Sequence, residues 1–223
     1  VTGNRNFITK IWSANNFLKI NNCKLNKNIN LQSIKLPINQ WIFSEFIKVQ
    51  NLVSKNIEIF RFDEAAKKAY QFVWHSYCDW YLEFLKPIFN SKKTPEIKEA
   101  KLFSSFMMAN ILKVLHPFIP FFTETVWSKN KYKSIFKTDL ISSNWPDFKN
   151  SKNFNKNQND INDLIELITN IRSTKSELKI TPKLFCDLSF SEKSNNLQKL
   201  VNNNLNLIKQ IGRVNAINNN KIK

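Results

Sequence analysis

The chain has 223 residues, a formal net charge of +17 and only two glycines, with 42% hydrophobic and 13% aromatic residues. This apolar content supports a folded core and excludes wholesale disorder. Walker and dinucleotide-binding phosphate loops need several glycines close together, and Gly3 and Gly212 stand alone, so both loop types are excluded. So little glycine also argues against a sheet-rich fold with many tight turns.

The positive charge is uneven along the chain. Residues 1–60 carry a net charge of +6, residues 61–127 carry +2, and residues 128–223 carry +9. Only four of the 34 basic residues are arginine and asparagine is abundant, a bias typical of an AT-rich genome, so part of the charge is compositional. Such a chain still attracts polyanions. The charge alone leaves open both a nucleic-acid binder and an unremarkable basic protein.

Cysteine usage and the chain ends bear on the compartment. The three cysteines lie far apart without a CxxC pair, which predicts neither a disulfide framework nor a zinc site and fits the reducing cytoplasm. The longest apolar stretch, residues 111–122, is too short and too interrupted to span a bilayer, so no membrane partner is expected. The sequence begins at Val1 without a signal-peptide pattern. We expect a piece of a longer chain.

Residues 4–20 are predicted to form the first helix. One arc of its helical wheel is apolar and forms the core face: Phe7, Ile11, Ala14 and Leu18. The opposite arc combines polar, basic and aromatic side chains: Asn6, Lys10, Ser13 and Phe17. A polar loop is expected over residues 21–36.

Apolar residues at spacings of three and four predict further helices in the first 127 residues: about 37–59, 62–84 with a continuation towards 87, 94–116 and 118–127. Thr94 is expected to be the N-cap of the helix that begins there. Pro117 disfavours helical geometry at His116, so a break is expected at that point. Aromatic residues cover a wide arc of the 62–84 helix and are expected in the core rather than at a binding surface: Trp74, Tyr77, Trp80 and Phe84.

The last third of the chain changes character. Residues 128–159 are rich in Lys, Asn and Ser and are predicted to be a connector anchored at Trp145-Pro146. A helix over 160–179, a strand over 184–190, a helix capped by Ser191 and a truncated or disordered tail after Ile217 follow. We therefore predict a mainly α fold in three parts: a helical bundle over 1–127, a connector over 128–159 that closes the bundle, and a small α/β piece over 160–223.

Residues for enzymatic chemistry are scarce. His75 and Asp79 are spaced for an i,i+4 pair without a nucleophile, and His116 is expected to contact the last carbonyls of its helix. Three carboxylates at the start of the 160–179 helix complement its dipole: Asp160, Asp163 and Glu166. We predict no catalytic and no metal-binding residues in this chain.

Binding to RNA is the function that these residues favour. On the Asn6/Lys10/Ser13/Phe17 arc, Lys neutralises phosphate, Asn and Ser hydrogen-bond bases or sugars, and Phe stacks on an unpaired base. The alternative is a solvated helix face with Phe17 under the next loop. A second basic patch lies at the end of the 160–179 helix, where a solvated face is again the alternative: Arg172, Lys175 and Lys179.

Five segments carry distinctive residues in a fixed order: 5–17, 61–83, 115–127, 145–146 and 168–183. Among them are Arg-Phe-Asp-Glu-Ala-Ala at 61–66, Cys-Asp-Trp-Tyr-Leu-Glu at 78–83 and Leu-His-Pro-Phe-Ile-Pro-Phe at 115–121. Together they resemble the anticodon-binding domain of class I aminoacyl-tRNA synthetases with branched aliphatic substrates. Segment 61–83 resembles the valyl-tRNA synthetase version, because the isoleucyl and leucyl versions do not usually combine Trp74 with the 78–83 run.

The resemblance implies a helical bundle that grips the anticodon stem and loop of valine tRNA. It also implies upstream catalytic and editing domains, which use ATP with Mg²⁺ and carry His-Ile-Gly-His-like and Lys-Met-Ser-Lys-Ser-like motifs that this sequence lacks. A C-terminal coiled coil is absent or barely begun after Gly212. This chain is therefore expected to bind tRNA but not DNA, to hold no cofactor, and to be inactive in aminoacylation alone.

Eight residues are the candidate tRNA contacts: Arg5, Asn6, Lys10, Ser13, Phe17, Arg61, Arg172 and Lys175. Arg61 opens a helix and has a structural ion pair as its alternative role. Three other identities stay open for the chain as a whole. They are a stand-alone helical RNA-binding module, a helical structural protein that binds no RNA, and the equivalent domain of an isoleucyl- or leucyl-tRNA synthetase.

Overall fold

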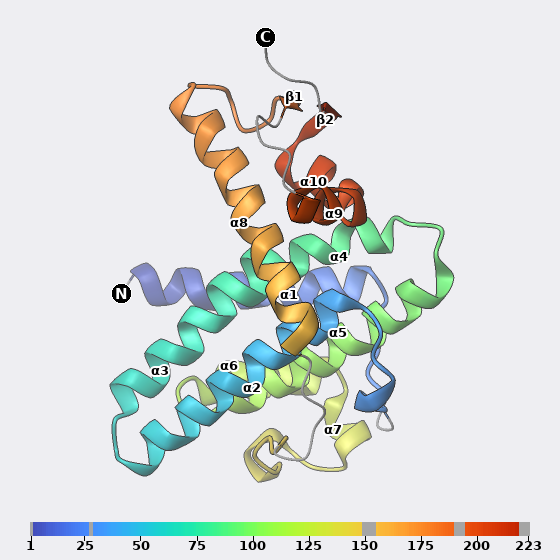
Figure 1. The fold of residues 1–223 in the computed structure, drawn as a ribbon. Coiled ribbons are helices and arrows are strands. Elements are labelled where there is room, and N and C mark those ends of the chain that lie inside the picture. The colour runs from blue at the N-terminus through green and yellow to red at the C-terminus, as the bar shows by residue number, and fades with distance from the viewer. Residues whose placement is uncertain (1, 27–28, 149–154, 190–194, 219–223) are drawn as a thin grey trace. The chain divides into compact units, whose positions relative to one another are not determined.

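The computed structural model describes residues 2–26, 29–148, 155–189 and 195–218 (Figure 1). The chain divides into two compact units, Val1–Asn155 and Lys156–Lys223, and each is described by itself.

The first unit is built from helices. The long ones are α1 (Thr2–Ile20), α2 (Pro37–Glu58), α5 (Thr94–Leu115) and a continuous run of α3 (Phe62–Gln71), the π-helical segment η2 (Phe72–Tyr81) and α4 (Leu82–Phe89). Shorter elements complete it: the 3-10 turns η1 (Leu31–Ser33) and η3 (Leu140–Ser142), and the helices α6 (Pro120–Lys129) and α7 (Tyr132–Phe136). Figure 1 shows α2 and α3 as a helical hairpin. The prediction of a mainly α fold is confirmed.

The apolar faces of these helices form one core. On α1 the predicted core arc is buried throughout: Phe7, Ile11, Ala14 and Leu18. The largest contributions come from aromatic rings, and Phe43, Phe46 and Phe106 all contact Phe148 at centroid distances of 5.1 to 6.1 Å. Trp145 donates from Nε1 to Ser54 Oγ at 2.9 Å. Residues 145–148 therefore attach to the bundle, as the sequence predicted for Trp145-Pro146.

The long third helix of the sequence contains a π-helical segment in its middle. Wider turns spread its aromatic residues around the helix axis. Tyr77 and Tyr81 stack at 5.6 Å and are buried, while Phe72 packs on Phe46 of α2. Just before the segment, Tyr70 packs on Phe7 of α1. Through these contacts, the helical run from α3 to α4 packs against both α1 and α2.

Several predicted details are wrong. Lys93, not Thr94, is the N-cap of α5, and no side chain caps it. His116 does not contact the last carbonyls, because its Nδ1 lies 2.8 Å from Thr123 Oγ1. The predicted connector contains α7, and the helix expected from residue 160 begins at Asn155. The predicted break at Pro117 is confirmed, since α5 ends at Leu115 and α6 begins at Pro120.

The second unit combines helices with a two-stranded sheet. Its elements are α8 (Asn155–Glu177), β1 (Cys186–Ser189), α9 (Asn195–Asn203), α10 (Leu205–Gly212) and β2 (Val214–Asn218). The strands are parallel, with Cys186 opposite Val214 and Leu188 opposite Ile217. β1 begins at Cys186 rather than at Leu184, and β2 is a strand that the sequence analysis did not predict. The predicted Ser191 cap and the end of the tail fall outside the described residues.

Candidate nucleic-acid interface

The outward arc of α1 contains both exposed side chains and side chains that contact other parts of the bundle. Asn6 and Ser13 are exposed, whereas Lys10 and Phe17 are half-buried. Arg5 at the start of the arc is also exposed, and among the described residues its guanidinium has no partner. Three of the predicted contacts are therefore available to a ligand.

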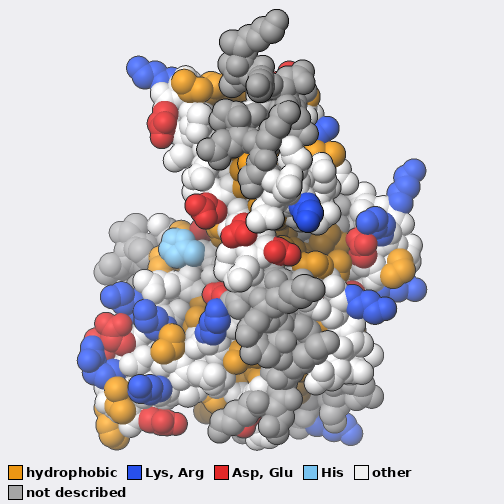
Figure 2. All heavy atoms as spheres, viewed as in Figure 1, with side chains coloured by type: hydrophobic (Ala, Val, Ile, Leu, Met, Phe, Trp, Pro, Cys, Tyr) orange, Lys and Arg blue, Asp and Glu red, His pale blue; other side chains and the backbone are white. Residues whose placement is uncertain are grey.

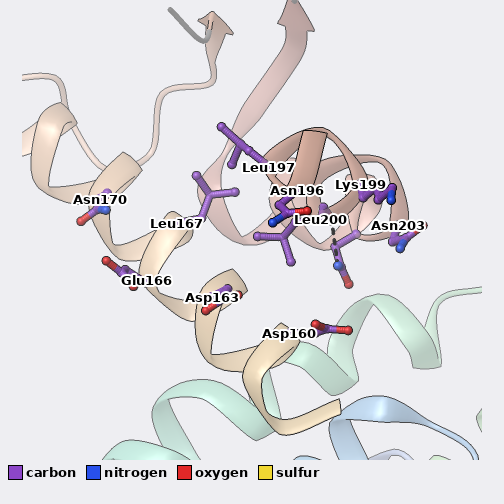
Figure 3. A pocket seen from close by; sticks show the side chains of 11 residues that line it. Asp160, Asp163, Glu166, Leu167, Asn170, Asn196, Leu197, Lys199, Leu200 and Asn203 are labelled. Atoms are coloured by element: carbon purple, nitrogen blue, oxygen red, sulfur yellow. Dashed lines mark hydrogen bonds between the residues drawn. The ribbon is translucent and has the colours of Figure 1, made fainter. Parts of the chain in front are cut away.

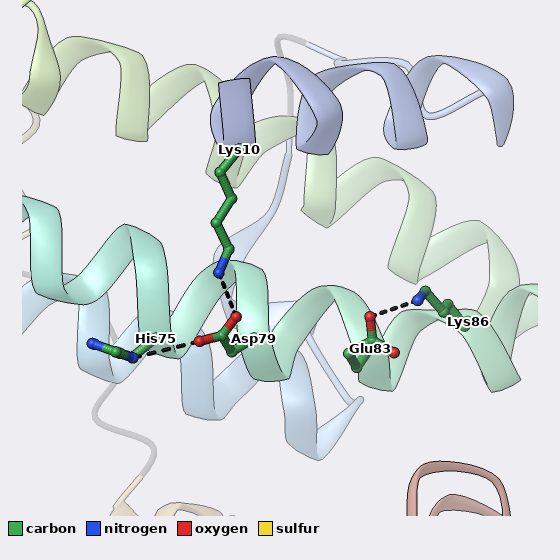
Figure 4. A network of polar contacts seen from close by, with 5 residues as sticks. All are labelled: Lys10, His75, Asp79, Glu83 and Lys86. Atoms are coloured by element: carbon green, nitrogen blue, oxygen red, sulfur yellow. Dashed lines mark hydrogen bonds and ion pairs between the residues drawn. The ribbon is translucent and has the colours of Figure 1, made fainter. Parts of the chain in front are cut away.

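Lys10 is engaged within the protein (Figure 4). Its Nζ lies 2.6 Å from Asp79 Oδ1 and 3.9 Å from the centre of the Trp74 ring, and 26% of the side chain is exposed. The second oxygen of Asp79 lies 3.4 Å from His75 Nδ1. The carboxylate neutralises the charge of Lys10, so a phosphate contact there would compete with an existing ion pair.

Phe17 also has a partner within the bundle. Its ring stacks on Phe89 of α4 with centroids 5.8 Å apart. One face of the ring is therefore used for packing against a helix rather than lying under the next loop. The role of Phe17 in base stacking stays a prediction.

The turn between α2 and α3 exposes aromatic rings beside Arg61. Phe60 is 79% exposed and Phe62 is 53% exposed, with centroids 6.2 Å apart. Figure 2 shows basic and hydrophobic side chains together at this turn. The Arg61 guanidinium lies 3.3 Å from Asp63, and this hydrogen bond lowers the pKa of Asp63 below its usual range. Exposed aromatics with arginine suit stacking on unpaired bases, and the sequence prediction did not include the two phenylalanines.

A lysine-rimmed pocket of about 450 Å³ lies where α1 and α6 end. Its rim residues are Lys19, Lys24, Lys129 and Lys131. Asn15 in its wall is 1% exposed and accepts a hydrogen bond from Asn130 Nδ2 at 2.7 Å. The sequence prediction missed this pocket because one pair of its lysines, Lys19 and Lys24, lies more than a hundred residues before the other pair, Lys129 and Lys131.

The basic patch of α8 separates into one structural lysine and exposed cations. Lys175 is 8% exposed, and its Nζ donates to the carbonyls of Leu184, Gly212 and Arg213 at 2.8 to 3.1 Å. Arg172 is exposed and donates from Nη2 to the Ile211 carbonyl at 3.2 Å. The geometry gives Lys175 an internal role, and its contact with RNA stays a prediction.

The other half of α8 is acidic. A pocket of about 650 Å³ separates it from α9, with Leu167, Leu197 and Leu200 in its wall. Figure 3 shows Asp160 and Asp163 on the side of α8 that faces α9. Because α8 begins at Asn155, these carboxylates lie beyond its first turn, which contains no acidic residue, and the predicted role of complementing the helix dipole is wrong. Three carboxylates and one lysine line this pocket, so its net charge is negative.

The buried titratable groups of the bundle are structural. Burial raises the pKa of the Cys78 thiol and of the Tyr132 hydroxyl to about 12, so both stay protonated at neutral pH. Among the described residues, no group of three or more His, Cys, Asp and Glu is placed to hold a metal ion.

In the part of the chain that the structure describes, no helix has the length and apolarity needed to cross a membrane.

The helical bundle and the sequence place the chain in a known class. Residues 39–190 match the family model of the anticodon-binding domain of tRNA ligase, so the chain belongs to this family.

Relatives within this class are valine--tRNA ligases. The chain is 41% identical over 98% of its length to valine--tRNA ligase of Pelagibacter ubique and 42% identical over 82% to that of Zymomonas mobilis. It is 34% identical over 97% to that of Bartonella quintana. The chain spans only about a fifth to a quarter of each of these relatives.

Proposed function

We propose that this chain is the tRNA-binding part of a valine–tRNA ligase and reads the anticodon of valine tRNA. The observation that carries the proposal is the 41% identity to a valine--tRNA ligase across 98% of the chain. In this proposal the whole cytoplasmic enzyme attaches valine to its tRNA with ATP. Catalytic and editing domains precede this chain, which does not aminoacylate by itself.

The isoleucyl- and leucyl-tRNA synthetase alternatives are not favoured, because the relatives named above are valine--tRNA ligases. A stand-alone RNA-binding module is not favoured either, since the match lies within much longer proteins.

Exposed side chains of the first unit suit both parts of tRNA recognition, the attraction of phosphates and the contact with unpaired bases. Arg5 attracts phosphates, which position the tRNA and make its affinity depend on salt. Arg61 lies 3.3 Å from Asp63 and 3.9 Å from Glu64, so it takes its alternative role in an ion pair. Asn6 and Ser13 offer hydrogen bonds to unpaired bases, and Phe60 offers an exposed ring for stacking. Lys10 and Phe17 contribute by holding α1 on the bundle.

ATP and Mg²⁺ belong to the catalytic domain in this proposal. Magnesium bound with nucleotide phosphates is held by one or two carboxylates beside a phosphate-binding site. Around the exposed basic residues of α1, the nearby carboxylate of Asp79 is paired with Lys10 and His75. That carboxylate is therefore already engaged, which supports assigning ATP and Mg²⁺ to the catalytic domain.

Binding of valine tRNA and of the same tRNA with a swapped anticodon, each at two salt concentrations, tests the proposal. We expect valine tRNA to bind about tenfold more tightly and both affinities to fall with salt. Equal affinities would contradict anticodon reading, and the absence of salt-dependent binding would contradict RNA binding altogether.

A pair of variants assigns the α1 contact. Arg5→Gln removes an exposed charge from the proposed interface and is expected to weaken binding about five- to tenfold at 0.1 M salt. Lys48→Gln removes one charge from α2, where Lys48 pairs with Glu45, and serves as the matched control. Equal losses in the two variants would show that only net charge matters.

A further inference from the structure

A basic pocket of about 560 Å³ lies at the C-terminal end of α8 in the second unit. Four cations line this C-terminal basic pocket: Arg172, Lys175, Lys179 and Arg213. The hydroxyl-bearing residues Ser176 and Thr181 line it too, and the described lining residues include no carboxylate. Its chemistry is therefore that of an anion site.

Two helices end beside this pocket, so the alternative explanation of its positive charge is that the cations stabilise the helix C-termini. Cations are favourable at the C-terminus of a helix, and the α8 and α10 termini together carry about one negative charge. Four positive charges exceed that amount. Helix termini alone do not account for the excess.

The terminal carbonyls are also already bound. The Lys175 carbonyl accepts from the Ile180 N–H at 2.8 Å, and the Ser176 carbonyl accepts from the Lys179 N–H at 3.0 Å. The Gly212 carbonyl accepts from Lys175 Nζ. Capping therefore does not use the Lys179 ammonium, which is exposed and has no acceptor among the described residues.

Lys175 positions the other cations. Its ammonium joins α8 to the carbonyls of Leu184, Gly212 and Arg213, and these acceptors leave its positive charge in place. Arg213 follows α10 and has φ of 53°, a left-handed conformation. Its guanidinium lies 5.7 Å from the Phe185 ring and donates one N–H to the Lys183 carbonyl at 3.5 Å. Four of its five N–H donors are left for a ligand.

We propose that the C-terminal basic pocket binds a backbone phosphate of RNA, with Lys179 and Arg213 as the contacts and Lys175 as a positioning residue. A guanidinium and an ammonium suit a phosphate oxygen pair, and nearby hydroxyls donate hydrogen bonds. The pocket at the other end of α8 is acidic, so within this unit the positive charge is concentrated at the C-terminal end of α8. This inference rests on the proposed function, the binding of tRNA.

The test measures binding of valine tRNA and its anticodon-swapped form from 0.05 to 0.2 M salt, with Lys179→Gln and Arg213→Gln. Each variant should weaken both tRNAs by the same factor, about five- to tenfold at 0.1 M salt. Each should also reduce the slope of log K against log salt by about 0.7–0.9, since phosphate contacts carry no sequence information. Lys199→Gln, an exposed lysine of α9 beside the acidic pocket, is the matched control and should bind like the unaltered chain.

The outcomes separate this inference from the proposed function. Unaltered binding by Lys179→Gln and Arg213→Gln, with weaker binding by Arg5→Gln, would overturn the pocket and leave the proposed function intact. An equal loss with Lys199→Gln would overturn it in favour of general attraction. Absence of salt-dependent binding by the unaltered chain would overturn both. Far-UV circular dichroism of each variant checks that it is folded, and Lys179→Arg should retain binding.

Discussion

Helices α1 and α8 each place a lysine where the sequence predicted a tRNA contact, and each lysine is used differently. On α1, Lys10 pairs with a carboxylate, which cancels its charge. On α8, Lys175 donates to three neutral carbonyls, which satisfy its hydrogen bonds and leave the charge in place. The two environments therefore have opposite effects on the local field.

This difference shows that the partners of a lysine, rather than its position on a helix, decide what it contributes to binding. Asp79 lies 69 residues after Lys10, and Gly212 lies 37 residues after Lys175. The basic character of α1 then depends on Arg5, whereas the C-terminal basic pocket gains from a cation that is itself inaccessible.

The strongest test of this contrast removes each ammonium in turn. Lys175→Met removes the Nζ donor from three carbonyls, of which, among the described residues, only that of Arg213 keeps another partner, the Cys186 N–H. It should lower the free energy of unfolding of the second unit by about 3 kcal/mol. Lys10→Met removes a partly exposed ion pair and a cation–π contact and should cost the first unit about 1 kcal/mol.

Urea unfolding with two probes separates these effects. All six tryptophans lie between residues 12 and 145, so tryptophan fluorescence follows the first unit alone, while far-UV circular dichroism follows both. Lys175→Met should shift the dichroism transition without moving the fluorescence transition, and Lys199→Met should shift neither. A Lys175→Met chain as stable as the unaltered one would refute the structural role of Lys175.

Phe17→Ala tests whether α1 uses its aromatic residue for packing or for RNA. Loss of the stack on Phe89 should lower the stability of the first unit by about 2 kcal/mol, measured by fluorescence-detected urea unfolding. Binding of valine tRNA by the folded variant should stay within about twofold. Phe17→Leu keeps apolar bulk and should recover much of the stability. Weakened tRNA binding with unchanged stability would assign Phe17 to base stacking instead.

Local periodicity predicted the parts of this molecule that depend on neighbouring residues. The core arc of α1 follows from spacings of three and four, and α5 ends at Leu115 because Pro117 disfavours a longer helix. β2 escaped prediction because Val-Asn-Ala-Ile-Asn alternates only weakly and its parallel partner lies far back in the chain. The carbonyl partners of Lys175 could not be predicted either, because every residue has a backbone carbonyl and the sequence does not show which ones a lysine will contact.

The smallest expected effect is a loss of stability of the first unit at alkaline pH, which should depend on Cys78 and not on Cys186 of the second unit. Burial raises the pKa of Cys78 from 9.0 to about 12, so above pH 9 the unfolded chain loses a proton that the folded chain keeps. The stability of the first unit should therefore fall as pH rises, by about 1 kcal/mol between pH 8 and pH 10 from this thiol. Fluorescence-detected unfolding should show a shallower decline for Cys78→Ala and an unchanged one for Cys186→Ala, which lies in the second unit. Equal declines in Cys78→Ala and the unaltered chain would contradict a buried, protonated thiol, because the buried tyrosines contribute mainly above pH 10.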